Sequence, residues 1–168
     1  MLDLVHQASV NFARVALYFE RSLLPADLEL LPSAAATLSR YERVGAAIAV
    51  ESSMGVGVPW KGGASVDGRP WPVTDGETVW IPKGRHTLEP AASGSGLRLI
   101  HLNADLKTAR IAGASRIEFS YESSARALAI LDRPPRRVEV DGTESLSLAG
   151  PRTVVLPRGQ HIVSIEGQ

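Results

Sequence analysis

A set of three short sequence motifs occurs twice, in the same order, in this chain of 168 residues. Its parts are Glu-Ser-Ser, Val-Asp-Gly and Pro-x-Gly-x-His. They begin at residues 51, 66 and 82 in the first half and at residues 122, 140 and 157 in the second, so the two copies are offset by 71, 74 and 75 positions. Offsets that change by only a few residues are what loop insertions produce between two copies of one unit. We therefore predict an internal repeat, with a first unit over 1–92 and a second over 93–168.

The repeated residues are those that tight turns require. An Asp-Gly pair between two strand-like runs predicts a two-residue hairpin, because glycine tolerates positive φ and aspartate nearly does. In Pro-x-Gly, proline presets φ for the second position of a turn and glycine suits the fourth, which predicts a second hairpin in each unit. The predicted turn residues are Asp67, Gly68, Pro82 and Gly84 in the first unit and Asp141, Gly142, Pro157 and Gly159 in the second.

From Gly45 onward the sequence has the residue pattern of an all-β protein. Short runs of β-branched and small apolar residues alternate with Gly, Pro and Asp-Gly turn signals at the spacing typical of β-sandwiches. We predict two tandem related β-sandwich units of immunoglobulin-like type; the alternative is a single larger sandwich to which each repeat supplies one sheet. The predicted strands are 46–52, 63–66, 78–81, 85–89, 97–103, 115–123, 126–132, 136–140, 152–156 and 161–166.

The residues before Gly45 follow other patterns. ARVALYFE at 13–20 alternates as a half-buried strand does. Two prolines interrupt the next segment, after which Ser33 can cap a helix. We predict one short helix near 33–43. The Gly/Ser-rich stretch 90–96 lacks apolar periodicity and is the predicted boundary between the units.

RRVEVDGTESLSLAGPRTVVLPRGQHIVSIE at 136–166 resembles the PEGA-type modules. Their pattern is a strand, a V-D-G turn, a second strand and then L-P-x-G-x-H-x-V-x-V. Residues 63–89 resemble the same pattern more loosely. Such modules are small β-sandwich accessory domains of bacterial exported, cell-surface and polysaccharide-related proteins. The resemblance implies a PEGA-like sandwich with an accessory role and brings no catalytic residues.

Charge and composition exclude several classes of partner. The chain has 18 basic and 18 acidic residues, so it lacks the positive excess that nucleic acids and anionic membranes attract. No apolar run approaches the ~20 residues of a membrane span. Cysteine is absent, which excludes disulfides and thiolate metal sites. The four histidines are scattered without paired ligand spacing, so we predict neither a metal nor a cofactor.

No catalytic motif is present in the sequence. A nucleophile elbow, a phosphate-binding P-loop and a His-Glu-x-x-His motif are all missing. Glu51 and Glu122 are equivalent in the repeat and could meet as an acid–base pair for sugar chemistry. Carboxylates at strand ends are more often simply solvated, so we predict no catalytic residues and a protein that is not an enzyme by itself.

The first residues, MLDLVHQASVNFARVAL, do not form a signal peptide, because they lack a basic opening and an uninterrupted apolar core. Two localisations remain open. The protein is cytoplasmic, or it is the tail of a longer chain whose export signal lies elsewhere, in which case it is periplasmic or extracellular.

All three tryptophans lie between residues 60 and 80. Trp80 matches Val155 of the second unit, which predicts a core residue. Trp60 and Trp71 lie in loops flanked by Pro and Gly, where an indole can stack on the C–H face of a sugar ring. The candidate carbohydrate-binding residues are Trp60, Trp71, Lys61, Asp67 and Arg69. The competing interpretation is that both loop tryptophans are buried in packing contacts.

Three functions follow from these patterns. The leading hypothesis is a non-catalytic accessory β-sandwich module, the C-terminal part of a larger bacterial glycan-active enzyme. Its partner would be carbohydrate or an adjacent catalytic domain of the same chain. The alternative is a structural or protein-interaction module without a ligand, and the least favoured hypothesis is a small stand-alone hydrolase.

Overall fold

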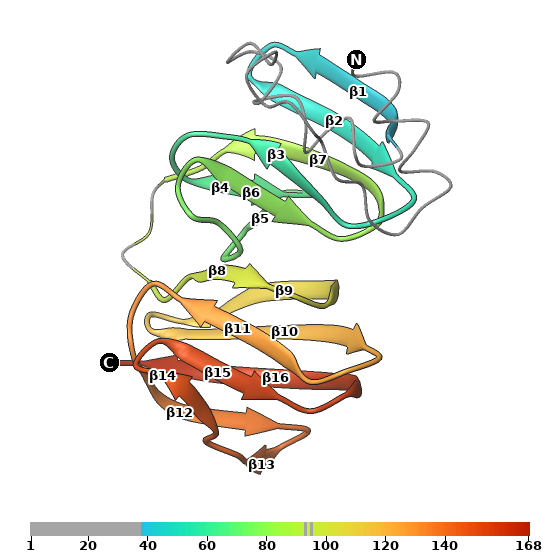
Figure 1. Ribbon diagram of the computed structural model, residues 1–168. Helices are drawn as coiled ribbons and strands as arrows, with labels where there is room; N and C mark the ends of the chain where they lie inside the picture. The colour runs from blue at the N-terminus through green and yellow to red at the C-terminus, as the bar shows by residue number, and fades with distance from the viewer. Residues whose placement is uncertain (1–37, 93, 95) are drawn as a thin grey trace, which may run out of the picture.

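The computed structural model describes residues 38–92, 94 and 96–168, which form sixteen strands in antiparallel sheets (Figure 1). The predicted all-β class is confirmed. The predicted short helix is wrong where it can be compared, because residues 38–43 lie in strand β1 (Leu38–Val44); 33–37 and the predicted strand 13–20 lie outside the described residues. Pairing of β1 with β2 (Ala47–Ser52), through a turn in which Gly45 has a φ of 62°, overrides the local helical preference.

The first unit consists of two sheets around a core of its own. In the five-stranded sheet the order is β1, β2, β7 (Gly84–Pro90), β4 (Ala64–Val66) and β5 (Arg69–Pro70), and the second sheet pairs β3 (Val56–Pro59) with β6 (Thr78–Ile81). The buried core is Ile48, Val50, Val56, Val58, Ala64, Val66, Val79, Ile81 and Leu88.

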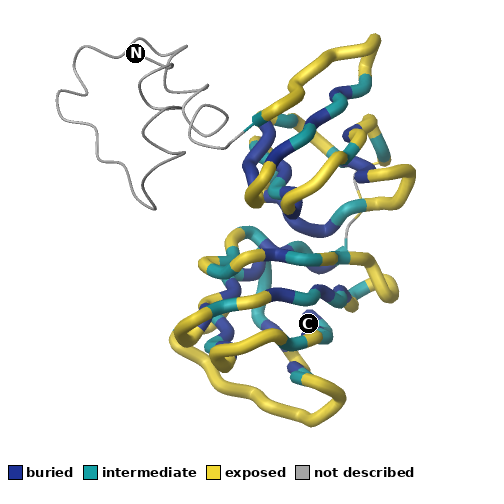
Figure 2. Tube along the Cα trace, turned by 90° about the vertical axis from the view of Figure 1, so that its right-hand side faces the viewer, coloured by how far each residue is buried: buried dark blue, intermediate teal, exposed yellow. Residues whose placement is uncertain are grey.

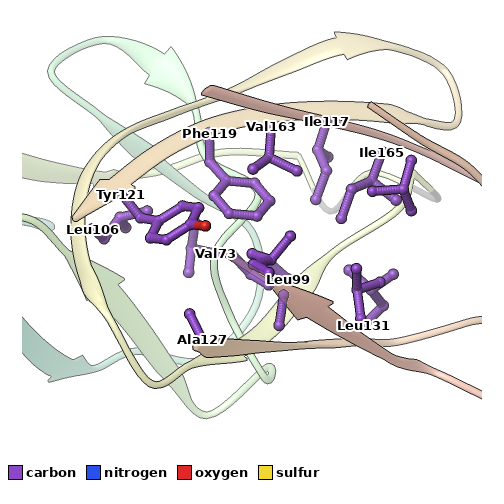
Figure 3. Close-up of a cluster of buried hydrophobic side chains, with 14 of the residues drawn as sticks. Val73, Leu99, Leu106, Ile117, Phe119, Tyr121, Ala127, Leu131, Val163 and Ile165 are labelled. Atoms are coloured by element: carbon purple, nitrogen blue, oxygen red, sulfur yellow. The ribbon is translucent and has the colours of Figure 1, made fainter. Parts of the chain in front are cut away.

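The second unit repeats this plan with longer strands. Its five-stranded sheet has the order β13 (Thr143–Glu144), β12 (Pro135–Val140), β16 (Gly159–Gly167), β10 (Arg116–Ser123) and β9 (Asp105–Gly113). The opposite sheet has the order β14 (Leu148–Gly150), β15 (Thr153–Leu156), β11 (Ala127–Leu131) and β8 (Leu99–Leu102). Side chains from both sheets fill the core between them (Figure 3).

Strand registers correspond in the two units. Glu51 lies opposite Arg85 across β2 and β7, and Glu122 lies opposite Gln160 across β10 and β16, which is the same pairing at the repeat offset. Each repeat supplies both sheets of its own sandwich, and Figure 2 shows a buried interior in each half. The chain therefore does not form the single larger sandwich considered as the alternative. The predicted division between 92 and 93 stays a prediction.

The two V-D-G segments are hairpin turns. Asp67 and Gly68 have φ values of 52° and 73°, and Asp141 and Gly142 have values of 50° and 78°. Two successive positive φ values are those of a type I′ turn, which matches the twist of the flanking strands. These turns connect β4 to β5 and β12 to β13.

The predicted hairpins at Pro-x-Gly are wrong. β6 pairs with β3, and β7 pairs with β2 and β4; likewise β15 pairs with β11 and β14, and β16 with β10 and β12. Both edges of β7 and of β16 are already filled, so the preceding strand cannot join the same sheet. The turns instead carry the chain from one sheet to the other, with φ values of 123° at Gly84 and 111° at Gly159.

Residues 72–74 join the two units through the backbone. The amide of Thr74 donates to the carbonyl of Leu99, and the amide of Leu99 donates to the carbonyl of Pro72, both at 3.0 Å. On the other side, Trp80 N donates to Val73 O at 3.1 Å. These bonds connect the smaller sheet of the first unit to the smaller sheet of the second. The side chain of Val73 lies in the core of the second unit (Figure 3).

Candidate ligand cleft between the two units

A cleft of about 440 Å³ opens where the two units meet. Apolar side chains form most of its wall, and polar groups lie among them. A concave, largely apolar site with a few polar groups is the usual form of a small-molecule binding site. The lining residues are Ser53, Met54, Gly55, Val56, Val73, Trp80, Ile81, Lys83, His101, Leu102, Ala104, Asp105 and Leu106.

Trp80 is the largest side chain in the wall of the cleft, and its neighbours fix the position of its ring. It lies opposite Gly57 on the adjacent strand β3. A Cβ atom on Gly57 would come within 2.9 Å of the indole, so glycine leaves the space that the ring occupies. The ring of His101 from the second unit meets the indole edge-on, with centroids 6.3 Å apart and planes at 83°.

Among the described residues, the indole N–H of Trp80 makes no hydrogen bond that would hold it within its own unit. Within the described part of the chain this nitrogen has no hydrogen-bond partner, and no buried side-chain nitrogen or oxygen there is left unpaired. The nitrogen is therefore not fully buried. An accessible indole donates one hydrogen bond and presents an apolar surface, a combination that suits ligands with both C–H faces and hydroxyl groups.

Charged groups lie at the rim of the cleft. The side chain of Lys83 is exposed and makes no ion pair with any described residue. Asp105 forms an ion pair with Lys107 at 2.6 Å, and Lys107 contacts Glu122 at 2.9 Å. The hydrogen bond to Asp105, and next the one to Glu122, raise the pKa of Lys107. The rim therefore offers both a cation and a carboxylate for polar contacts.

The two loop tryptophans predicted to bind carbohydrate lie outside this cleft, and their N–H groups are used internally. Trp60 Nε1 donates to Gly63 O at 3.2 Å, and Trp71 Nε1 donates to Trp80 O at 2.8 Å. Both side chains are half-buried. Trp60 packs against the core of the first unit, whereas Trp71 packs against both cores. Trp71 also lines a second hollow of about 320 Å³.

The polar residues predicted around those tryptophans have different environments. Lys61 and Glu77 form an exposed ion pair at 3.9 Å. Arg69 is exposed on β5. The carboxylate of Asp67 is occupied on both oxygens, since it accepts hydrogen bonds from the ring of His86 at 2.8 Å and from the amide of Thr87 at 2.8 Å. Asp67 therefore stabilises its own turn.

The contact between Asp67 and His86 recurs in the second unit as Asp141 and His161. His161 Nδ1 lies 2.7 Å from Asp141 Oδ2, and the amide of Ile162 donates to Asp141 Oδ1 at 2.9 Å. This pairing is not among the contacts predicted from the sequence. The signal was present, because aspartate and histidine recur together, 19 and 20 residues apart. The contact ties the V-D-G hairpin to the turn between the sheets, so we assign it a structural role.

Both ring nitrogens of His161 face acceptors, since Nε2 lies 2.9 Å from the carbonyl oxygen of Arg158. Only the protonated ring can donate to a carboxylate and a carbonyl at once. The hydrogen bond to Asp141, together with that carbonyl, raises the pKa of His161. The same bond, together with the amide of Ile162, lowers the pKa of Asp141.

The stability of the protein should therefore depend on this pair and on pH. The contribution of His161 is complete below its unfolded pKa of about 6.5 and is lost as pH rises through its higher folded pKa. The contribution of Asp141 is present above its unfolded pKa of about 4 and is lost as pH falls through its lower folded pKa. We expect urea midpoints to fall between pH 6 and pH 9 in the wild type and to fall less in His161→Gln. Equal slopes in the two proteins would contradict the assignment.

The second unit adds a buried tyrosine to the same corner. The hydroxyl of Tyr121 donates to the carbonyl of Pro157 at 2.6 Å, and its ring centroid lies 5.8 Å from that of His161. Burial, and next the charge of Asp141, raise the pKa of Tyr121 to about 12. The tyrosine is therefore a neutral donor that holds the turn and does not serve as an acid or a base near neutral pH.

The described residues contain no cluster of three or more His, Asp or Glu side chains that could hold a metal ion. They also contain no helix of the length and apolar character that crossing a membrane requires. Comparisons of the chain with protein-family models, with curated proteins and with solved structures found no match.

Proposed function

We propose that this chain is a non-catalytic accessory β-sandwich module that binds carbohydrate in the cleft beside Trp80. The observation that carries the proposal is the indole of Trp80, which is held between Gly57 and His101 and whose N–H has no hydrogen-bond partner among the described residues. The C–H face of a sugar ring stacks on such a surface, while its hydroxyl groups need nearby donors and acceptors. His101, Lys83 and Asp105 line the cleft and supply these groups.

The two carboxylates considered for acid–base chemistry are used in ion pairs within their own sheets. Glu51 is ion-paired with Arg85 at 2.9 Å, and Glu122 is ion-paired with Lys107 at 2.9 Å. Each pair lies on a five-stranded sheet of its own unit, and neither glutamate lines the cleft. Glycoside hydrolysis needs two carboxyl groups facing one bond, one of them with a raised pKa. The described residues offer no such pair in the cleft.

The repeat supplies a substitution that tests the cleft. Val155 stands in the second unit where the first has Trp80, so Trp80→Val keeps an apolar strand residue that this fold accepts. We expect Trp80→Val to weaken binding to a polysaccharide array or to insoluble polysaccharide at least tenfold. His101→Ala, at an exposed position, should weaken it several-fold. Circular dichroism and melting temperature should establish that both variants are folded.

The matched control is the double variant Trp60→Phe/Trp71→Phe, which retains apolar packing at the two other tryptophans. Binding that survives this change but not Trp80→Val places the ligand in the cleft. Binding lost only in the double variant would move the site to Trp60 and Trp71. A folded wild type that binds no polysaccharide would refute the carbohydrate proposal and leave a module whose partner is a protein.

A further inference from the structure

The strand edge formed by residues 146–148 is the counterpart of the edge through which the first unit contacts the second. In the first unit, Trp80 N donates to Val73 O at 3.1 Å and Trp71 N donates to Ala64 O at 3.0 Å. In the second, Val155 N donates to Ser147 O at 2.8 Å and Ser145 N donates to Val138 O at 2.9 Å. These bonds correspond residue by residue, so the segment 146–148 is equivalent to 72–74.

This equivalence shows which backbone groups of the second unit point outward. Ser145 and Ser147 face the chain's own strands. The backbone N–H and C=O groups of successive residues in an extended segment point alternately to its two edges. The N–H and C=O groups of Leu146 and Leu148 therefore point to the opposite edge, away from the chain's own strands. In the first unit the equivalent groups bind β8. Among the described residues, no backbone partner binds these outward groups of Leu146 and Leu148, and the two residues are 51% and 46% exposed.

The edge also lacks the charges that protect other edges of this protein. The outer strands of the two five-stranded sheets, β1, β5, β9 and β13, all carry at least one charged residue. Charges at an edge discourage pairing with another chain. The stretch Ser-Leu-Ser-Leu-Ala-Gly at 145–150 has none. An uncharged edge with unpaired backbone groups and alternating exposed leucines is suited to strand addition.

We propose that this edge docks a second copy of the same chain, residues 146–148 against residues 146–148, about a twofold axis at Ser147. In the first unit β8 occupies the equivalent edge in parallel pairing, which shows that a strand of this protein can pair there. In a second copy, β8 is already paired on both sides, by β11 and by residues 72–74. The other uncharged outer strand, β3, ends in Pro59, which has no N–H to donate, so the edge that the second copy offers is the same segment, 146–148.

Twofold symmetry makes the two edges complementary. In an antiparallel pair centred on Ser147, Leu146 lies opposite Leu148 of the second copy, and the reverse pair is identical. Each such pair exchanges two backbone hydrogen bonds and places two leucine side chains side by side. The two four-stranded sheets then form one continuous sheet across the dimer.

A single cysteine tests the axis directly, because the chain has no cysteine of its own. The two Ser147 residues would form a non-hydrogen-bonded pair with Cα atoms about 4.5 Å apart, which a disulfide can span. Under mild oxidation we expect Ser147→Cys to form covalent dimers at least ten times faster than Ser124→Cys, an exposed control in a bend. Non-reducing electrophoresis measures the rates.

A second variant separates self-association from folding. Leu146→Pro removes one outward N–H, and the first unit already has proline at the equivalent position, Pro72. We expect the wild type to show concentration-dependent dimerisation in analytical ultracentrifugation, and Leu146→Pro to stay monomeric with an unchanged melting temperature. Equal crosslinking rates for the two cysteine variants, or a wild type that is monomeric at millimolar concentration, would overturn the proposal. Crosslinking at Ser147 that Leu146→Pro does not slow would equally overturn it.

Discussion

Val73→Asp is expected to destabilise the protein by about 3–5 kcal/mol, the usual cost of a buried charge without a partner. Val73 is 2% exposed and lies in the core of the second unit, although it belongs to the first. Its segment also provides the backbone bonds that join the two smaller sheets. Urea unfolding should therefore show a lower midpoint and, because the units lose their shared segment, two separate transitions.

Ser147→Asp is the matched control, since Ser147 occupies the equivalent position in the second unit and is exposed. An aspartate there stays hydrated, so the free energy of unfolding should change by less than about 0.5 kcal/mol when it is measured at low protein concentration. If Val73→Asp and Ser147→Asp lower the free energy of unfolding by similar amounts, the junction is no more important to stability than an open strand edge.

The junction at Val73 also determines the shape of the candidate cleft. Trp80 and Lys83 come from the first unit, whereas His101 and Asp105 come from the second. A cleft whose walls belong to two units keeps its geometry only if those units are held together. The backbone bonds of residues 72–74 hold them next to β6 and β8, the strands that carry Trp80 and His101. A substitution at Val73 that loosens the junction should therefore also weaken ligand binding at Trp80.

Local turn chemistry made part of this fold predictable from sequence. Asp67 and Asp141 adopt the positive φ that an Asp-Gly pair suggests, because this conformation depends on two residues alone. The turns at Pro82 and Pro157 were predicted to be hairpins, but they cross between sheets. That outcome depends on which strands already fill the edges of β7 and β16, and no local pattern contains this information.

The candidate site was predictable only in part, for a similar reason. Trp80 is predicted to be a core residue because its counterpart is Val155, and it does pack against the core of the second unit. The cleft that it also lines could not be predicted, because it exists only where the first unit meets the second. The edge strands β1 and β9 were also missed, since their residues are mostly exposed and lack a strong apolar alternation. Contacts between distant segments determine these features. The paired aspartate and histidine, by contrast, could have been found by asking which polar residues recur together.

Gly159→Val should be the most damaging substitution among the turn glycines, at about 2–4 kcal/mol. Gly159 has a φ of 111°, which a β-branched residue resists at a cost of about 1–3 kcal/mol. A Cβ atom there would also lie 3.1 Å from Nε2 of His161. That ring cannot easily move aside, because Asp141 holds it at 2.7 Å. The cost of backbone strain and the cost of the close contact with His161 therefore add at this position.

Gly142→Val separates these two causes. Gly142 has a φ of 78°, but a Cβ atom there would meet nothing within 4 Å, so we expect only the strain of about 1–3 kcal/mol. Measuring Gly159→Val again in a His161→Ala background removes the crowded ring and should reduce its cost by about 1 kcal/mol. A cost at Gly159 that is no larger than at Gly142, or that His161→Ala leaves unchanged, would show that the histidine ring moves freely and that its bond to Asp141 does not hold this corner.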